Sequence, residues 1–213
     1  MSAKIVRIET AGPGAKARRL VFDDNLDPRV TSPAAVRELG LLVGASANRG
    51  AVEDALRTIE FPLAKERALL LLGYREHSSA ELVRKLGDCG YPGDVARAVA
   101  DRLTEVELVD DGRFAHAWAR SRLSCGYGPR RIRQELVQRG VDSALVDDAL
   151  AEAVEAESEA ALERKALRGR TPTAPRGRER LLRRLVGRGF SMSAALSALD
   201  SEMSAASFLD RGE

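Results

Sequence analysis

PRRIRQELVQRGV (residues 129–141) contains the unit from which most of this chain is built. Its proline suits the first turn of a helix, where a missing N–H group costs nothing. Ile132 and Leu136 are one helical turn apart, and Gly140 follows four residues later. A glycine at this place is typical of a left-handed cap that turns the chain back toward the core. The stretch therefore predicts a short amphipathic helix over residues 129–139, ended by Gly140.

The same spacing occurs in three places. The matching sets are Leu82, Leu86, Gly90 and Tyr91, then Ile132, Leu136, Gly140 and Val141, then Leu181, Leu185, Gly189 and Phe190. The copies are about 50 residues apart and a further helical pattern follows each one, so we expect tandem three-helix repeats. Short helices need neighbours to be stable, and stacked repeats form an elongated, curved body. From about residue 63 onward the sequence has no strand pattern.

The first sixty residues follow a different pattern. KIVRIET (4–10) and ARRLVF (17–22) are β-branched runs separated by a Gly-Pro-Gly turn, which predicts a β-hairpin. Short helices are expected over 33–39, with Ser32 as N-cap, and over 49–59. The predicted fold is mainly α, with a small N-terminal β-hairpin/α domain and three helical repeats. The expected domains are 1–62, 63–107, 108–157 and 158–213.

Composition places the chain among ordinary globular proteins. It has 213 residues, a net charge of +2 and two cysteines, which suit free thiols better than a disulfide framework or a zinc site. It has neither a long apolar run nor the pattern of a signal peptide, so we expect a cytoplasmic protein without a membrane span. The charges are segregated: seven acids and no Lys or Arg lie in 142–159, whereas 164–188 holds ten Lys and Arg residues and one acid.

Outward arginines of the second and third repeats are the candidate contact residues. They are Arg130, Arg131, Arg133, Arg139, Arg176, Arg178, Arg180, Arg183 and Arg184. Such a surface suits either nucleic-acid backbone or an acidic protein, and the acidic stretch 142–159 suits a basic one. A merely solvated face is the alternative. Few aromatic residues interleave with the arginines, which gives stacking on bases little support.

Catalytic and metal patterns are weak in this sequence. Neither His77 nor His116 has a Cys, Asp or Glu at a ligand spacing that repeats elsewhere in the chain, and no phosphate-binding loop is complete. Asp110 and Asp111 form the best carboxylate pair, and an N-capping role before the helix that contains Phe114 explains them better than Mg²⁺ binding in a nuclease. We therefore expect neither catalytic residues nor a metal, cofactor or small-molecule substrate.

Two longer segments resemble the signatures of the RecX family, bacterial regulators of the RecA recombinase. They are GYREHSSAELVRKL (73–86) and LVDDGRFAHAWARSRLSCGYGPRRIRQELVQRGV (108–141). The resemblance is strong over about 63–150 and weaker in the third repeat, to about residue 199. The motif residues, mainly structural, are Tyr74, Arg75, Ser78, Leu82, Leu86, Asp110, Asp111, Phe114, Gly128, Ile132, Leu136 and Gly140.

The resemblance implies a non-enzymatic protein of tandem three-helix units. RecX-like proteins bind the RecA filament in its helical groove and suppress its ATPase, strand-exchange and repressor-cleavage activities, and many bind single- or double-stranded DNA. The sequence departs from the family pattern at Glu107, where glycine is often found, in a longer Pro/Arg-rich loop at 170–178, and in an N-terminal region that only part of the family has. A general DNA-binding helical-repeat protein without a recombinase target is the competing interpretation.

Overall fold

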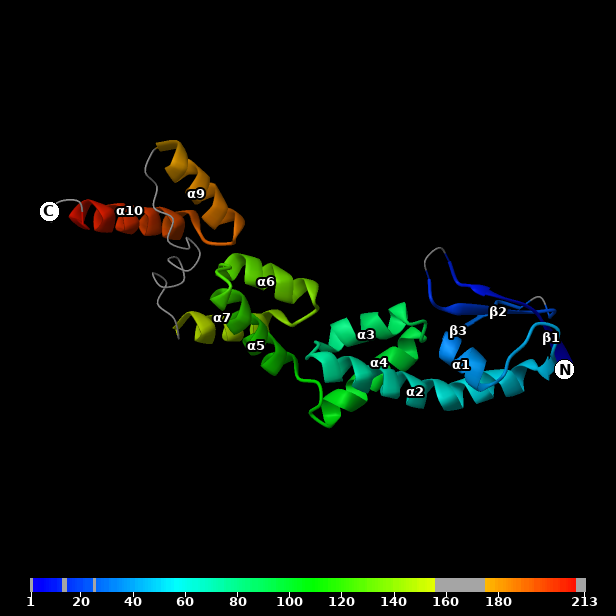
Figure 1. Cartoon of the computed structure of the whole chain (residues 1–213). Coiled ribbons are helices and arrows are strands. Elements are labelled where there is room, and N and C mark those ends of the chain that lie inside the picture. Colours follow the sequence, from blue (N-terminus) through cyan, green and yellow to red (C-terminus); the bar gives the residue numbers. More distant parts are fainter. Residues whose placement is uncertain (1, 13–14, 25, 156–174, 210–213) are drawn as a thin grey trace. The chain divides into compact units, whose positions relative to one another are not determined.

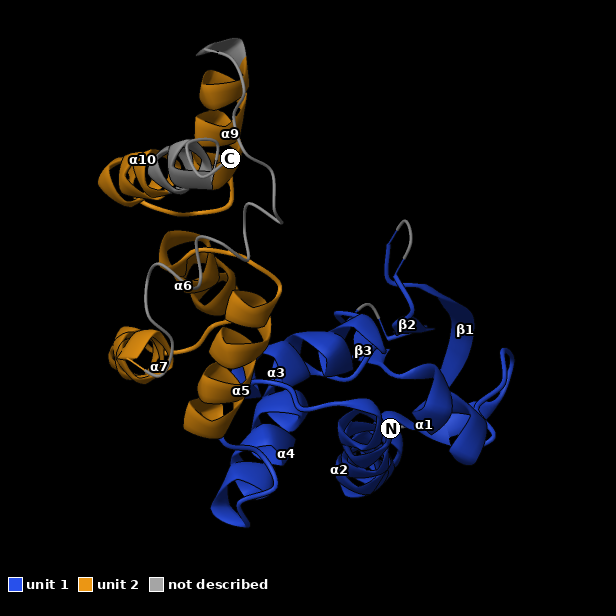
Figure 2. Cartoon of the chain, turned by 60° about the vertical axis from the view of Figure 1, so that its left-hand side comes forward, with its two compact units in different colours: residues 1–110 blue, residues 111–213 orange. Residues whose placement is uncertain are grey.

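The computed structural model describes residues 2–12, 15–24, 26–155 and 175–209. The chain forms two compact units, Met1–Asp110 and Asp111–Glu213, which are coloured separately in Figure 2. Apart from the N-terminal strands the described elements are helices, so the predicted mainly α fold is confirmed. The elongated shape and the boundaries of the repeats stay predictions. No described helix is long and apolar enough to cross a membrane.

Unit 1 begins with a small antiparallel sheet. The predicted hairpin is confirmed as β1 (Ser2–Thr10) and β2 (Arg18–Phe22). Two three-residue strands that the sequence analysis did not predict, β3 (Arg29–Thr31) and β4 (Ser46–Asn48), complete the order β3-β2-β1-β4. One face of the sheet lies against α1 (Pro33–Glu38) and the first half of α2 (Arg49–Tyr74), as Figure 1 shows, and Ile5 and Leu20 are fully buried there.

Helix α1 (Pro33–Glu38) has the predicted cap, since Ser32 Oγ accepts from Ala35 N at 3.1 Å. The next prediction, a short helix over 49–59, is wrong in extent, because α2 runs without interruption from Arg49 to Tyr74 (Figure 1). Pro62 lies inside it, and so does the expected domain boundary after residue 62.

Packing explains why α2 continues through a proline. Its buried positions recur every four residues, and they are Val52, Leu56, Glu60, Ala64 and Ala68. One uninterrupted stripe therefore packs first against the sheet and then against the first repeat, and its burial outweighs the hydrogen bond that Pro62 cannot make.

The first repeat consists of the second half of α2 with α3 (Ser79–Asp88) and α4 (Gly93–Glu105). Its core includes Leu82, Leu86 and Leu103, each fully buried. In unit 2, α5 (Asp111–Ser124), α6 (Pro129–Gln138) and α7 (Ser143–Glu155) form the second repeat. Helices α9 (Pro175–Gly187) and α10 (Met192–Leu209) follow, and their apolar faces join the core of the second repeat.

All three predicted glycine caps are confirmed. Gly90, Gly140 and Gly189 have φ angles of 96°, 78° and 98°, in the left-handed region that glycine adopts without strain. Glu107, just after α4, also has a positive φ, 58°. The backbone therefore has the left-handed conformation that suits glycine, although this chain places a side chain at the position.

Candidate binding site

Helix α6 is amphipathic, as the sequence predicts, with its apolar residues in the core and its polar residues toward solvent. Ile132 and Leu136 are fully buried in the core of unit 2. Arg130, at the first turn, is exposed, and the described residues offer it no ion-pair partner. Gln134 and Gln138 follow Arg130 at intervals of four residues and are exposed as well. The outer face of α6 therefore carries one arginine and two side-chain amides in a row.

Two further predicted arginines of α6 pair with acids of the same unit. Arg131 Nε donates to Glu135 Oε1 at 3.2 Å, and Arg133 forms an ion pair with Asp147 of α7. Their side chains are 46% and 48% exposed, so they remain open to a partner. Reversing either charge would break an internal ion pair.

Arg139, the C-cap residue of α6, lies over an aromatic ring. Its guanidinium carbon is 3.9 Å from the centroid of the Trp118 ring. Arg122 approaches the same ring at 5.1 Å, and Phe114 stacks beside it at 5.8 Å between centroids. Arginine guanidinium groups stack favourably on aromatic faces, and the planar fork keeps its edge available for hydrogen bonds.

A second ring, that of Tyr127, is in contact with arginines from three parts of unit 2. Arg122, Arg131 and Arg188 lie 4.6, 4.9 and 5.7 Å from its centroid. We call Arg122, Arg131, Arg139, Arg188, Trp118 and Tyr127 the arginine–aromatic cluster. The sequence analysis missed it, because its members are scattered along the chain and only the fold brings them together.

Glu135 is the acid at the centre of this cluster. Arg122 donates to its two oxygens at 2.6 and 2.7 Å, and Trp118 Nε1 donates at 3.1 Å. Burial would raise the pKa of Glu135, but the hydrogen bonds from Arg122 and Arg131 outweigh it and lower the pKa below its ordinary value. Glu135 therefore stays ionised, and its carboxylate oxygens accept hydrogen bonds from side chains of the same unit.

Helix α9, like α6, has both arginines that pair within unit 2 and arginines that are exposed without an ion-pair partner among the described residues. Arg178 forms an ion pair with Asp200 of α10 at 2.6 Å, and Arg184 is half-buried. Arg180 and Arg183 are exposed without an ion-pair partner among the described residues. The side chain of Arg176 lies outside the described residues.

The start of α6 and the end of α9 meet through their main chains. Gly128 N donates to Arg188 O at 2.7 Å, and Arg130 N donates to Gly189 O at 3.1 Å. A Cβ at Gly128 would lie 2.4 Å from Gly189 C, and a Cβ at Gly189 would lie 2.5 Å from Arg131 Cβ. Only glycine fits at both positions without displacing the neighbouring main chain.

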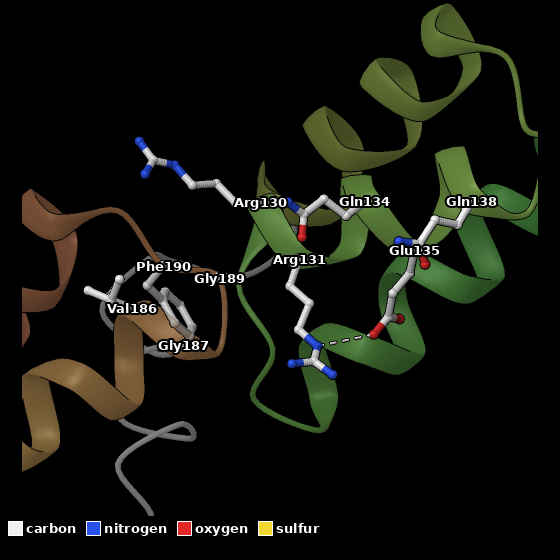
Figure 3. Close-up of a pocket in the computed structure, with 9 residues that line it drawn as sticks. All are labelled: Arg130, Arg131, Gln134, Glu135, Gln138, Val186, Gly187, Gly189 and Phe190. Carbon is white, nitrogen blue, oxygen red and sulfur yellow. Dashed lines mark hydrogen bonds and ion pairs between the residues drawn. The ribbon is translucent and has the colours of Figure 1, made fainter.

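A groove of about 410 Å³ lies beside this junction, between α6 and the end of α9 (Figure 3). Its lining residues are Arg130, Arg131, Gln134, Glu135, Gln138, Val186, Gly187, Gly189 and Phe190. Figure 3 shows Arg131 directed toward Glu135, whereas Arg130 extends away from that pair. The predicted contact residues Arg130 and Arg131 are thus brought together at one site with side chains that the sequence analysis did not select.

The acidic helix α7 is engaged within its own unit. His116 lies 3.3 Å from Asp148 and 3.1 Å from Glu152, and Arg120 lies 3.5 Å from Glu152. Together with Asp147, which pairs with Arg133, these contacts use much of the acidic surface that the sequence analysis offered to a basic partner.

The first-repeat motif forms a buried polar cluster. Arg75 donates to both oxygens of Glu81, at 2.7 and 3.0 Å, and His77 Nδ1 lies 2.9 Å from Glu81 Oε2. Ser78 Oγ accepts from Glu81 N at 3.1 Å and so caps α3. Burial would raise the pKa of Glu81, but the Arg75 and His77 hydrogen bonds lower it to about 2. An ionised carboxylate only accepts, so His77 Nδ1 carries the donated proton.

The remaining motif residues are divided between core and surface. Leu82, Leu86 and Phe114 are buried, in line with the structural role that the resemblance gave them. Tyr74, at the end of α2, is 88% exposed and takes no part in a core. Helix α5 begins at Asp111, and the described residues contain no group of three His, Cys, Asp or Glu side chains suited to a metal ion.

Comparison with known proteins matches two family descriptions to this chain. "RecX, first three-helix domain" covers residues 64–103, and "RecX, second three-helix domain" covers 110–150. Two crystal structures are similar. One, titled regulatory protein RecX, has a TM-score of 0.57 at 24% identity and covers 93% of this chain and 99% of its own. The other, RecX from Lactobacillus salivarius, has a TM-score of 0.54 at 21% identity, covering 67% and 98%.

Curated relatives share much more sequence. The regulatory protein RecX of Pseudomonas entomophila is 41% identical over 138 residues, which are 63% of this chain and 88% of the relative. That of Mycolicibacterium smegmatis is 40% identical over 149 residues, covering 66% and 79%. With both three-helix domains matched and this identity over most of the relatives' length, the chain belongs to the RecX family of regulatory proteins.

Proposed function

We propose that this protein is a negative regulator of RecA. It binds the RecA–DNA filament in the cytoplasm and suppresses ATP hydrolysis, strand exchange and repressor cleavage by RecA, and it needs no cofactor and catalyses no reaction itself. Membership in a family of regulatory proteins supports this role. One observation supports a particular binding surface for this role: three exposed arginines have no acidic partner among the described residues. They are Arg130, Arg180 and Arg183.

The position of these arginines favours contact with DNA backbone over reading of bases. In helix-turn-helix proteins the last helix of the motif enters the major groove, where basic and amide side chains contact bases. The last helices of repeats 2 and 3, α7 and α10, contain no Lys or Arg. The exposed arginines lie on the second helices, α6 and α9, and phosphate contacts made there would carry no sequence preference.

The test is the ATPase rate of RecA on single-stranded DNA, titrated with this protein at substoichiometric ratios. We expect the wild type to inhibit, and the variant Arg130→Glu/Arg180→Glu/Arg183→Glu to need at least tenfold more protein for the same inhibition. Arg131 and Arg133 stay unchanged, because their reversal would break the ion pairs with Glu135 and Asp147.

The matched control reverses three exposed arginines of unit 1 that also have no ion-pair partner among the described residues, Arg7, Arg37 and Arg97. It changes the net charge by the same amount, so a general electrostatic effect would weaken both variants equally. Equal inhibition by the wild type and both variants would remove the assignment of this surface. A protein that binds DNA but leaves the RecA ATPase unchanged would support the competing interpretation, a general DNA-binding protein.

A further inference from the structure

The groove between α6 and α9 differs chemically from the exposed arginines around it. Of its charged lining residues, Arg131 and Glu135 pair with each other, and Glu135 also accepts from Arg122 and Trp118. Arg130 is left as the one lining arginine without a described ion-pair partner. A groove that follows a nucleic-acid backbone needs positive charge along its length and open aromatic faces. This groove has one arginine without a described ion-pair partner, Arg130, a second that pairs with Glu135, and the Glu135 carboxylate in its wall.

The other lining groups suit a polypeptide. The amides of Gln134 and Gln138 each donate and accept, so they match the alternating N–H and C=O groups of a peptide backbone. Val186, 37% exposed, supplies an apolar contact on the opposite wall. Gly187 is exposed and has nothing within 4 Å of the place where a Cβ would stand, so another backbone can approach closely there.

The spacing along α6 fits an extended chain. Four residues of helix advance about 6 Å, and two residues of extended chain advance about 6.6 Å. Arg130, Gln134 and Gln138 can therefore contact alternate residues of one strand-like segment. A carboxylate side chain would meet Arg130, and the two amides would bind main-chain groups farther along.

We propose that this groove binds an extended segment of the protein component of the filament, with an acidic side chain at Arg130 and a small apolar side chain on Val186. The proposal rests on the proposed function, because that function supplies the protein partner. It divides the surface proposed above into two parts and moves Arg130 from the phosphate contacts to the protein contacts: the groove, with Arg130, holds polypeptide, and the exposed Arg180 and Arg183 of α9 contact phosphate.

Two double variants separate these parts. Gln134→Ala/Gln138→Ala removes the groove amides, and both positions are exposed in a helix that tolerates alanine. Arg180→Ala/Arg183→Ala removes the charges outside the groove. Fluorescently labelled wild type and variants are titrated with RecA in the absence of DNA and with single-stranded DNA in the absence of RecA, after circular dichroism has verified equal helix content.

We expect the glutamine variant to lose at least tenfold in affinity for RecA and less than twofold for DNA, and the arginine variant to show the larger loss on DNA. A glutamine variant that binds RecA like the wild type overturns the groove assignment alone, provided that the wild type inhibits the RecA ATPase. Parallel loss of DNA affinity assigns the groove to nucleic acid instead. Wild type that neither binds nor inhibits RecA overturns the proposed function and the groove proposal with it.

Discussion

The first and second repeats both place an arginine from the first helix region on a glutamate of the second helix, but they bury the pair differently. In repeat 1, Glu81 is 3% exposed and binds Arg75 and His77. In repeat 2, Glu135 is 15% exposed and lies among arginines stacked on aromatic rings. The same kind of arginine–glutamate ion pair is therefore buried inside the first repeat, whereas in the second repeat its glutamate lines a groove at the surface.

Removing the two carboxylates is the strongest test of this contrast. We expect Glu81→Gln to lower the free energy of unfolding by about 2–3 kcal/mol, since a buried pair is broken while Arg75 stays 43% exposed and partly screened by solvent. Glu135→Gln should cost about 1 kcal/mol, because its site is more open. Urea denaturation is followed by far-UV circular dichroism and by fluorescence of the single tryptophan, Trp118, which lies in unit 2.

The two readouts distinguish the units. Glu81→Gln should move the circular-dichroism transition and leave the Trp118 fluorescence transition in place, whereas Glu135→Gln should move the fluorescence transition. An equal shift of both transitions by Glu81→Gln would mean that the two units unfold together, and the contrast between sealed and open pairs would lose its basis.

The junction between α6 and α9 should be nearly as sensitive. Gly189→Ala places a Cβ 2.5 Å from Arg131 in a left-handed backbone, so we expect a loss of about 2 kcal/mol in the stability of unit 2. Gly187→Ala is the control, because a Cβ there meets nothing within 4 Å and alanine favours the helix. A Trp118 fluorescence transition that moves equally in both variants would contradict the close approach.

Acid should destabilise the first repeat by protonating Glu81 in its buried polar cluster. The pKa of Glu81 falls from an ordinary 4.5 to about 2 on folding, so its stabilisation is complete above pH 4.5 and is lost as the pH falls toward 2. Burial lowers the pKa of His77, which adds a loss below pH 6.5. Burial raises the pKa of Glu60, which opposes both because its protonated form is favoured in the fold.

The measurement is the urea midpoint by circular dichroism at pH 7, 5 and 4. Between pH 7 and 4 the Glu81 contribution should fall by about 1 kcal/mol. Glu81→Gln should show a shallower dependence on pH than the wild type, because the titrating carboxylate is gone. An identical slope in the two proteins would show that Glu81 does not carry the acid sensitivity.

The smallest effect is expected at Glu107, where the two units adjoin in sequence. A side chain in the left-handed region costs about 1 kcal/mol, so Glu107→Gly should be more stable than Glu107→Ala by about that amount, or about 4 °C in melting temperature. Both variants lose the same carboxylate, and their difference isolates the backbone. A more stable alanine variant would rule out strain at this residue.

The repeats could be predicted from the sequence because their signals are local. A glycine cap such as Gly140 and its two apolar neighbours lie within a dozen residues, and each set sufficed to place a helix and its end. Strands β3 and β4 have three residues each, too few for an alternating pattern, and they exist only through pairing with β2 and β1. The length of α2 was underestimated because a proline such as Pro62 usually ends a helix. Packing against residues far away in the sequence stabilises the helix on both sides of it.

The candidate site was predictable only in part, for the same reason. Outward arginines of α6 follow from helical periodicity, and Arg130 is where it was expected. Which arginines pair internally does not follow, since Asp147 and Glu135 reach Arg133 and Arg131 only in the folded chain. The cation–π contact of Arg188 with Tyr127 joins residues that lie 61 positions apart, and the sequence around each residue does not predict it.

The contact between Gly128 and Gly189 is made by main-chain atoms, and this has a consequence for how such proteins diverge. Every amino acid except proline can donate such a hydrogen bond, so the junction requires glycine at two positions and makes no demand on the outward side chains of α6 and α9. Those side chains can therefore be exchanged, and the preference for a partner altered, without disturbing the stacking of α9 on α6.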